Sequence, residues 1–465
     1  MYASSLIEVV RCHLGAAGAP APAGAAPVPL REELEARLTD PRKPRGIRHS
    51  LGSLVSVLIA GVACGYCSPL AIAGAAAGWD QEVLAAHGTR RNPVTRLHEP
   101  PSASTLGRLP ALLDADELEA GLSAWLTPAA LDPQLAARIA ARAASTKAGG
   151  GNRRRRKPPA GQALREVRAD GWFRAAPGHP WLDSAVTGDP AHRPVVRAVG
   201  VDGKERKLAK AGGNKKVHLL GAITHVTGLV IGQDKVAKAG KAGKANEITH
   251  FKPLLDPLPL QGAVITADAM QTTRDNARWI VQDKHAHYLV PVLGNQPGLY
   301  AVLDALDWEN TPVAAATSQI SRGRIETRTI RVLPAPPGPD FPYASQAILL
   351  ERYVTIKNNG RWIMRNCEAV LYVTSLDTTQ ASPADLLALI RGHWTIEHLH
   401  WLRDVVWRED KSTIRTGNAP QVISALTNLV ITLFRLQGVT KITEETRRNA
   451  QNPHRPLQLL ALRPG

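Results

Sequence analysis

Apolar residues in the middle of the chain occur in short runs that are separated by turn signals. Three such runs cover 195–202, 217–226 and 229–236, and Thr227-Gly228 forms a turn between the last two. Runs of this length, bounded by Gly and polar residues, are typical of β-strands. The pattern therefore predicts a three-stranded meander in this region.

Helical and strand patterns alternate after the meander. We expect a helix at 246–255, a strand that ends at Asp268, a second helix that ends near Lys284, and a strand at 287–293. A longer helical pattern at 384–408 comes much later in the chain. This order of elements is that of a ribonuclease H-like fold, so we predict an α/β protein with a mixed sheet and flanking helices.

A β-rich insertion interrupts this core. Strands are expected at 325–332, 347–356 and 368–375, and Asn358-Asn359-Gly360 is a hairpin signal after the second of them.

The first part of the chain has the apolar periodicity of short helices joined by turns. Ser102 and Asp114 are candidate capping residues. The expected loops carry several basic residues, namely Arg42, Lys43, Arg45, Arg48, Arg90 and Arg91. Two interpretations stay open, a small helical DNA-binding domain or a packing domain with solvated basic loops.

These patterns divide the chain into seven predicted segments. They are a disordered N-terminus (1–30), an all-helical domain (31–142), a basic linker (143–190), the first part of the core (191–296), the β-rich insertion (297–380), the acidic helix and C-terminal helices of the core (381–440) and a basic tail (441–465). The linker contains a run of arginines that would neutralise phosphates without reading sequence: Arg153, Arg154, Arg155 and Arg156.

Charge and cysteine content narrow the class of partner and the compartment. The chain has 57 Lys and Arg against 40 Asp and Glu, a formal net charge of +17, which favours a polyanionic partner. Four cysteines are too few for a disulfide framework, and Cys64 and Cys67 fit two small packed residues better than half of a zinc site. The apolar stretch 51–77 is diluted by Gly, Ser and Pro69, so we expect no membrane span and a cytoplasmic location.

Three acidic residues stand where the apolar pattern gives a folding reason to avoid a charge. Asp202 and Asp268 end two apolar runs, and Glu397 falls within the apolar stripe of the 384–408 helix. Burying an unpaired carboxylate costs several kcal/mol, so three such acids predict a shared cation. Ligand sets made only of oxygen suit Mg²⁺ (or Mn²⁺), and two such ions cleave and join phosphodiesters.

Basic and aromatic residues flank these acids. Five of them are candidates for phosphate binding, with a solvated surface as the alternative: Lys204, Arg391, Arg408, Lys411 and Arg415. Trp394 and Trp401 lie at helical spacing and are expected in the core rather than stacked on a base.

Several ordered motifs between about residues 35 and 440 resemble bacterial insertion-sequence transposases of the Asp-Asp-Glu class. The motifs in the core are Val201-Asp202-Gly203-Lys204, Thr266-Ala267-Asp268-Ala269-Met270, Gly294-Asn295-Gln296, Arg322-Gly323-Arg324-Ile325-Glu326-Thr327-Arg328, Arg391-Gly392-His393-Trp394-Thr395-Ile396-Glu397 and Glu409-Asp410-Lys411 with Arg415-Thr416-Gly417-Asn418-Ala419. Two further motifs resemble the helical transposase-associated domain of that class. They are Leu38-Thr39-Asp40-Pro41-Arg42-Lys43 and residues 102–106.

The resemblance implies a catalytic triad of Asp202, Asp268 and Glu397. It also implies double-stranded DNA partners, at the element ends and the target, and a homodimer or larger synaptic complex. Many relatives carry Tyr, Arg and Lys around the glutamate where this chain has Ile390, His393 and Asp404, so no DNA-hairpin mechanism is assigned.

Two alternatives belong to other classes of protein. One is a transposase-derived DNA-binding protein that has lost its activity. The other is a zinc hydrolase that uses His393, Glu397 and His400, which are spaced to share one face of a continuous helix.

Overall fold

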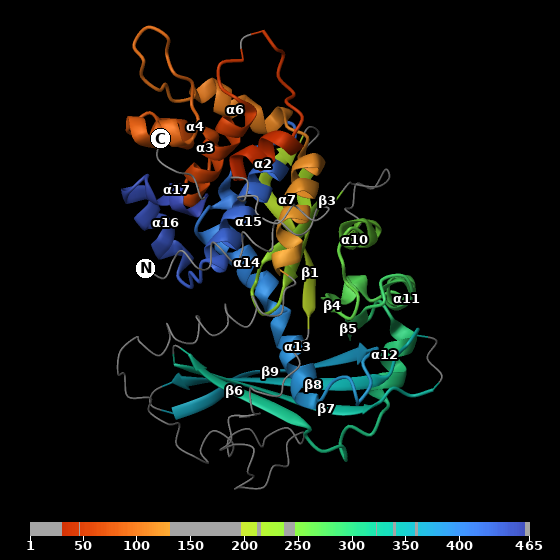
Figure 1. The fold of residues 1–465 in the computed structure, drawn as a ribbon. Helices are drawn as coiled ribbons and strands as arrows, with labels where there is room; N and C mark the ends of the chain where they lie inside the picture. Colours follow the sequence, from red (N-terminus) through yellow and green to blue (C-terminus); the bar gives the residue numbers. More distant parts are fainter. Residues whose placement is uncertain are drawn as a thin grey trace. The chain divides into compact units, whose positions relative to one another are not determined.

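The fold is described from a computed structural model (Figure 1). It describes residues 30–45, 47–130, 197–211, 215–236, 247–321, 323–337, 341–358 and 361–460. The expected disordered N-terminus up to residue 29, the basic linker with Arg153, Arg154, Arg155 and Arg156, and the end of the basic tail lie outside the described residues.

The chain separates into two compact units. The first contains residues 1–148, 201–258 and 395–465, and the second contains residues 149–200 and 259–394.

Short capped helices make up the N-terminal part of the first unit, as the apolar periodicity predicts. They are α2 (Leu30–Arg37), α3 (Leu51–Ala63), α4 (Pro69–Ala76), α5 (Gln81–Ala86), α6 (Ala103–Leu112) and α7 (Ala115–Ala130). Ser50, Ser68, Asp80 and Ser102 each accept a hydrogen bond from a backbone N–H of the first turn. These caps explain where four of the helices begin.

The C-terminal helices complete the first unit. They are α14 (Trp394–Val405), whose first residue belongs to the second unit, the 3₁₀ turn η5 (Glu409–Lys411), α15 (Ala419–Leu436), α16 (Ile442–Gln451) and α17 (Arg455–Leu459). Helix α15 packs against α3, α6, α7 and β3. It is long and apolar enough to cross a membrane, but 94% of it is buried inside the fold, as expected for a core helix.

The predicted meander forms the strands of the first unit. Strands β1 (Ala198–Ala211), β2 (Lys215–Thr224) and β3 (Val230–Lys235) lie in the order β3-β2-β1. The turn before β3 contains Gly228 with φ 67°, a conformation that glycine adopts without strain. The predicted helix α10 (Glu247–Leu255) packs on β2 and β3.

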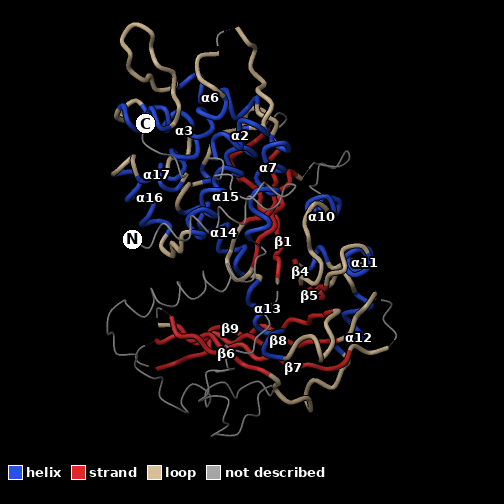
Figure 2. Tube along the Cα trace, in the orientation of Figure 1, coloured by secondary structure: helices blue, strands red, loops and turns tan. Residues whose placement is uncertain are grey.

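A larger part of the sheet lies in the second unit, where the first residues of β1 neighbour β4 (Figure 2). The following strands are β4 (Val264–Ala267), β5 (His287–Val292), β9 (Arg361–Thr374), β8 (Gln346–Asn358), β7 (Arg324–Pro334) and β6 (Ala315–Ser321), in that spatial order. Strands β4 and β5 pair parallel, whereas the β5–β9, β9–β8, β8–β7 and β7–β6 pairs are antiparallel, which confirms the mixed sheet. The remaining elements are η4 (Ala269–Gln271), α11 (Arg274–Gln282), α12 (Pro297–Asp304) and α13 (Pro383–Gly392).

The insertion continues the core sheet instead of forming a separate one, because β9 pairs with β5. Its first strand, β6, is absent from the sequence prediction. The segment Ala315–Ser321 is largely polar and lies at the edge of the sheet, so it carries no buried apolar pattern. The predicted hairpin is present, since Asn358 pairs with Arg361 across the connection between β8 and β9.

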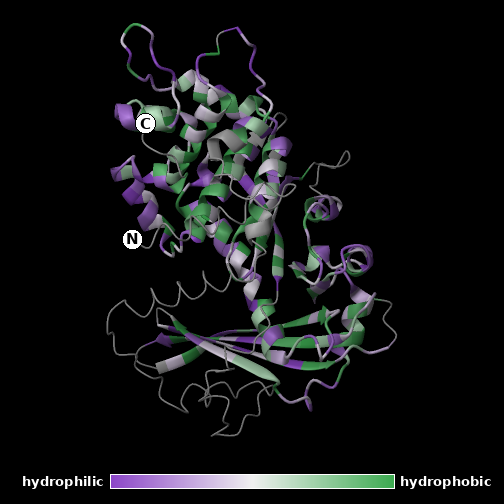
Figure 3. Ribbon diagram, in the orientation of Figure 1, coloured by the Kyte–Doolittle hydropathy of each residue, from purple (hydrophilic) through white to green (hydrophobic). Residues whose placement is uncertain are grey.

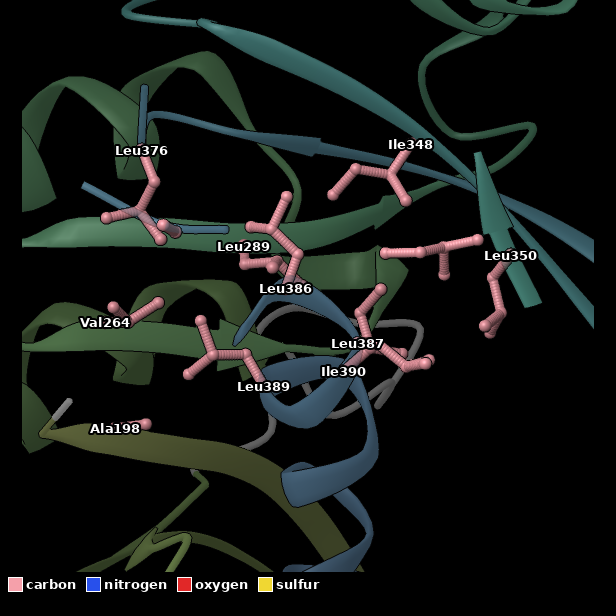
Figure 4. Close-up of a cluster of buried hydrophobic side chains, with 12 residues drawn as sticks. Ala198, Val264, Leu289, Ile348, Leu350, Leu376, Leu386, Leu387, Leu389 and Ile390 are labelled. Carbon is pink, nitrogen blue, oxygen red and sulfur yellow. The ribbon is translucent and has the colours of Figure 1, made fainter. Parts of the chain in front are cut away.

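Helix α13 covers one face of this sheet. A capping box joins Ser382 and Asp385 at its start. Its four buried apolar residues pack against strand residues of the second unit (Figure 4): Leu386, Leu387, Leu389 and Ile390 against Val264, Leu289, Ile330, Ile348 and Leu350. Burying each such side chain stabilises the fold by roughly 1.5–3 kcal/mol.

A buried ion network holds the first unit together. The carboxylate of Glu409 accepts two hydrogen bonds from Arg403 of α14, at 2.6 and 2.7 Å, and lies 3.5 Å from Nε of Arg206 on β1. Ser424 of α15 donates a third hydrogen bond to it at 2.5 Å, and Arg206 donates to the carbonyl of Pro420 at 2.6 Å. One carboxylate thus joins β1, α14 and α15.

The surroundings of Glu409 decide its charge. Burial alone would raise its pKa, but Arg403, Arg206 and Ser424 together lower the pKa to about 2. The carboxylate is therefore ionised at neutral pH and compensates two buried guanidinium groups.

We expect Glu409→Gln to lower the free energy of unfolding by about 3–5 kcal/mol, because two buried cations lose their counter-charge. Glu444→Gln removes an exposed ion-paired carboxylate and should cost no more than about 1 kcal/mol. Denaturant unfolding of both variants measures the difference, and equal small effects would contradict the structural role of Glu409. The wild-type contribution is present above the unfolded pKa of 4.5 and is lost as the pH falls toward 2.

Candidate active site

Asp202 lies within β1 and not at its end, which corrects the sequence prediction. Its side chain is 22% exposed, its Oδ1 accepts a hydrogen bond from the N–H of Gly203 at 2.8 Å, and its Oδ2 lies 3.5 Å from Nδ1 of His400. The apolar run stops at Asp202, but β1 continues through polar residues to Ala211. Apolar periodicity marked only the end of the apolar part of the strand, because it does not report a strand that continues through polar residues.

Glu397 lies on α14 and is exposed, so the burial argument made for it from sequence is wrong. The expected single helix at 384–408 is two helices, α13 and α14, with a break at His393. This break shifts the apolar face. The buried residues of α14 are Ile396, Leu399, Leu402 and Arg403, whereas Trp394, Trp401 and Val405 are 41%, 53% and 49% exposed.

Strand β1 and helix α14 meet along a regular set of contacts in the first unit. Alternate residues of a strand share one face, and on β1 these are Asp202, Lys204 and Arg206. Asp202 lies beside His400, and Lys204 Nζ donates a hydrogen bond to Asp404 Oδ2 at 2.8 Å. Arg206 forms an ion pair with Glu409, and Glu409 also pairs with Arg403 of α14.

Glu397 extends the same stripe of α14. Residues 397, 400 and 404 lie at i, i+3 and i+7, which is one face of a helix. A Cβ at Gly221 of β2 would lie 3.9 Å from both Asp202 O and Ile396 Cδ1, so the backbone of Asp202 and the residue before Glu397 both lie beside Gly221. Two of the three predicted acids therefore lie on adjoining elements of the first unit.

Asp268 directly follows β4 in the second unit, as predicted, and is half-buried at the start of η4. The loop after β5 holds this segment in place. Asn295 donates a side-chain hydrogen bond to Ala269 O at 2.5 Å, and Gln296 donates one to Thr272 O at 2.9 Å. The motif Gly294-Asn295-Gln296 gave no role from sequence, and the structure assigns it the positioning of the Asp268 loop.

His393 caps the C-terminus of α13 in the second unit. Its Nδ1 lies 3.0 Å from Thr266 Oγ1 on β4, and burial lowers its pKa to about 4, so it is neutral at pH 7. His393 therefore lies outside α14, the helix that carries Glu397 and His400, so the single continuous helix assumed by the zinc hydrolase alternative is not present. Among the described residues, no three His, Cys, Asp or Glu side chains gather closely enough to hold one metal ion.

Cys64 and Cys67 fit the interpretation as packed residues. Cys64 caps α3 and is buried, and burial raises the pKa of its thiol to about 12. Neither it nor Cys67 forms a disulfide.

Among the residues predicted to bind phosphate, Lys204 departs most from its prediction. Its side chain is 7% exposed and forms ion pairs with Asp404 and Asp410, whose carboxylates lie 2.8 and 3.4 Å from Nζ. It acts as a buried cation between β1 and α14, not as the solvent-facing group that the sequence suggested.

The other predicted cations that the structure describes are exposed. Arg408, Lys411 and Arg415 lie between α14 and α15 in the first unit. Arg391 lies near the end of α13 in the second unit and donates a hydrogen bond to Gln319.

Trp394 is not a core residue, which corrects the sequence interpretation. Its ring packs against the guanidinium groups of Arg328 and Arg352, 5.1 and 4.9 Å from the ring centroid. These arginines pair across β7 and β8, and Glu326 bonds both. Trp401 stacks on His398 with ring centroids 5.6 Å apart. Helical spacing alone could not show these partners, because the strand arginines are distant in sequence.

The sequence matches two families of known proteins. The family described as "Transposase DDE domain" matches residues 187–433, and "DDE_Tnp_1-associated" matches residues 34–126. The chain is 33% identical over 250 residues to "Putative transposase YncI" of Escherichia coli O157:H7, covering 51% of this chain and 61% of that protein. It is 31% identical over 266 residues to "H repeat-associated putative transposase YhhI" of Escherichia coli (strain K12), covering 52% and 65%. The matches span less than two thirds of these relatives.

Among solved structures, the chain is similar to a piggyBac transposase synaptic complex with hairpin DNA. The TM-score is 0.31 with 12% sequence identity, over 57% of this chain and 53% of that one. A likeness this distant carries no argument about the site.

We expect Glu397→Gln to change the free energy of unfolding by less than about 1 kcal/mol, because the side chain is exposed. Ile396→Ala removes a fully buried neighbour on the same helix and should cost about 2–5 kcal/mol. Denaturant unfolding without divalent metal tests the pair. A loss for Glu397→Gln as large as that for Ile396→Ala would show that the acid serves the fold.

Proposed function

The chain belongs to the Transposase DDE domain family, and from this membership we propose that it is the transposase of a bacterial insertion sequence. In this proposal it cuts DNA at the ends of the element and joins those ends to target DNA. The observation that carries the proposal is the placement of Asp202 on the face of β1 that meets α14, the helix that presents Glu397.

The three acids suit hard divalent cations. Asp202, Asp268 and Glu397 offer only carboxylate oxygens, and each is half-buried or exposed, so a metal ion and water can reach it. We propose that they hold two Mg²⁺ or Mn²⁺ ions. When bound, such ions activate a water or a DNA 3′-hydroxyl and stabilise the leaving oxygen in an in-line displacement.

The protein residues around the acids orient them. The N–H of Gly203 fixes one oxygen of Asp202, and His400 lies beside the other. Lys204 supports the same strand by pairing with Asp404 of α14. These contacts restrict the side chain of Asp202 to one rotamer. A fixed rotamer is required of a group that must be positioned for reaction.

Exposed cations in the first unit supply contacts for the DNA backbone in this proposal. Arg408, Lys411 and Arg415 follow α14 within a short segment, next in sequence to the helix that carries Glu397. A homodimer or larger synaptic complex would bring two element ends together.

We expect Asp202→Asn, Asp268→Asn and Glu397→Gln each to lower the rate of strand cleavage and joining at least about 100-fold, since metal-bound charge stabilisation is worth several kcal/mol. Cleavage of a duplex carrying the element end, assayed in Mg²⁺, measures this. Asp304→Asn and Glu309→Gln, which change exposed acids of α12 and the loop after it, are matched controls and should cut normally.

The choice of metal separates the proposal from its alternatives. Mg²⁺ or Mn²⁺ should support cleavage, EDTA should stop it, and Ca²⁺ should bind with little turnover because its coordination is longer and looser. Activity restored by Zn²⁺ alone and lost on replacing His393 and His400 would overturn the proposal. Wild-type protein that binds the duplex but never cuts it in Mg²⁺ or Mn²⁺ would identify an inactive DNA-binding relative.

A further inference from the structure

Two long loops connect helices of the first unit (Figure 1). One covers residues 40–50, between α2 and α3, and the other covers residues 90–99, between α5 and α6. Together they contain seven Lys or Arg and two Asp or Glu, so their formal net charge is 7 − 2 = +5. Both loops include long hydrophilic stretches (Figure 3).

A buried histidine joins the two loops. His49 is 8% exposed, its Nδ1 accepts a hydrogen bond from the N–H of Arg90 at 3.1 Å, and its carbonyl accepts one from Arg42 Nη2 at 3.0 Å. Burial, together with the charges of Arg90, Arg42 and Arg48, lowers the pKa of His49 and keeps it neutral. The end of the first loop is therefore joined to the start of the second through one uncharged acceptor.

The second loop is fixed by its own hydrogen bonds. A bridge pairs Arg91 with His98, and Asn92 Oδ1 accepts the N–H groups of Val94 and Thr95 at 2.8 and 3.2 Å. Arg96 adopts a left-handed backbone conformation with φ 61°. Its backbone carbonyl accepts a hydrogen bond from Arg91 Nε at 2.7 Å.

Helix α5 anchors the base of this loop. The side chain of Gln81 bonds both the N–H and the carbonyl of His98, at 2.6 and 3.1 Å. The loop is ordered before it meets any partner, so binding costs little conformational entropy.

Each of the two acids in these loops pairs with an arginine of its own loop. Arg42 bonds Asp40 through two guanidinium nitrogens, at 2.8 and 2.6 Å, and Arg90 lies 3.6 Å from Glu99. Five exposed cations remain, and within the described part of the chain none of them pairs with a carboxylate: Lys43, Arg45, Arg48, Arg91 and Arg96. We name these five residues the two-loop surface.

We propose that the two-loop surface binds the phosphate backbone of duplex DNA. Uncompensated cations on an ordered scaffold match a regular polyanion, because each phosphate contact releases counterions. Lys and Arg are the usual partners of phosphate oxygens, so we assign these five residues to holding the duplex and not to reading its sequence. The proposal rests on the proposed function only in taking DNA as the substrate.

The test replaces one cation on each loop, Arg45→Gln and Arg96→Gln, in the full chain. Binding to an element-end duplex and to a random duplex is measured by fluorescence anisotropy in EDTA at several salt concentrations. Each lost phosphate contact lowers the slope of log K against log salt by about 0.9, so we expect the slope to fall by about 2 on both duplexes. The matched control Lys441→Gln with Arg447→Gln removes the same charge from exposed positions at α16 and should leave the slope unchanged.

Binding without divalent metal does not depend on the catalytic acids, so a failure of the cleavage assay and a failure of this test are separate results. A slope unchanged in the loop variant, or lowered equally in the control, would show that the loops are merely solvated. Selective loss on the element-end duplex would show that the loops read sequence, and loss of binding to an RNA hairpin but not to DNA would identify RNA as the partner. Each of these outcomes overturns the proposal.

Discussion

The ionised carboxylate of Glu409 is the contact on which the first unit depends. It lies in the interior, where a charge is tolerated only if it is compensated. Arg403 of α14 hydrogen-bonds it, and Arg206 of β1 lies 3.5 Å from it as a second counter-charge. Strand β1 and helix α14 are therefore fixed to each other by a charge balance as well as by apolar packing. Asp202 precedes Arg206 on the same face of β1, so the position of the candidate catalytic acid follows from a structural ion pair several residues away.

Much of the sheet could be predicted because apolar residues report burial directly. The meander, the short strand before Asp268 and the parallel strand β5 appear where the apolar runs lie. Polar segments gave no such signal. Edge strand β6 and the second half of β1 are held by backbone pairing in the sheet, and the sequence contains no periodicity that would reveal it.

The residues of the candidate site stay a prediction, and the physical argument that selected one of them is wrong. Asp202, Asp268 and Glu397 were selected on the argument that buried acids need a cation, and Glu397 is exposed. The error arose because the helix breaks at His393, directly after Gly392, so the apolar period of α13 does not continue into α14. Lys204 shows the opposite error. It was expected to face solvent and bind phosphate, but it is buried and forms an ion pair within the protein.

The exposure of Glu397 has a consequence for the history of such genes. A side chain that contributes little to folding can be lost by mutation without any loss of folded protein, so selection on protein stability does not remove the defective gene. If the proposed function holds, a cell that accumulates copies of the element will contain intact proteins that still occupy DNA ends and cannot process them. Under that proposal, an exposed acid would let each inactive copy compete with the active ones for the same DNA ends.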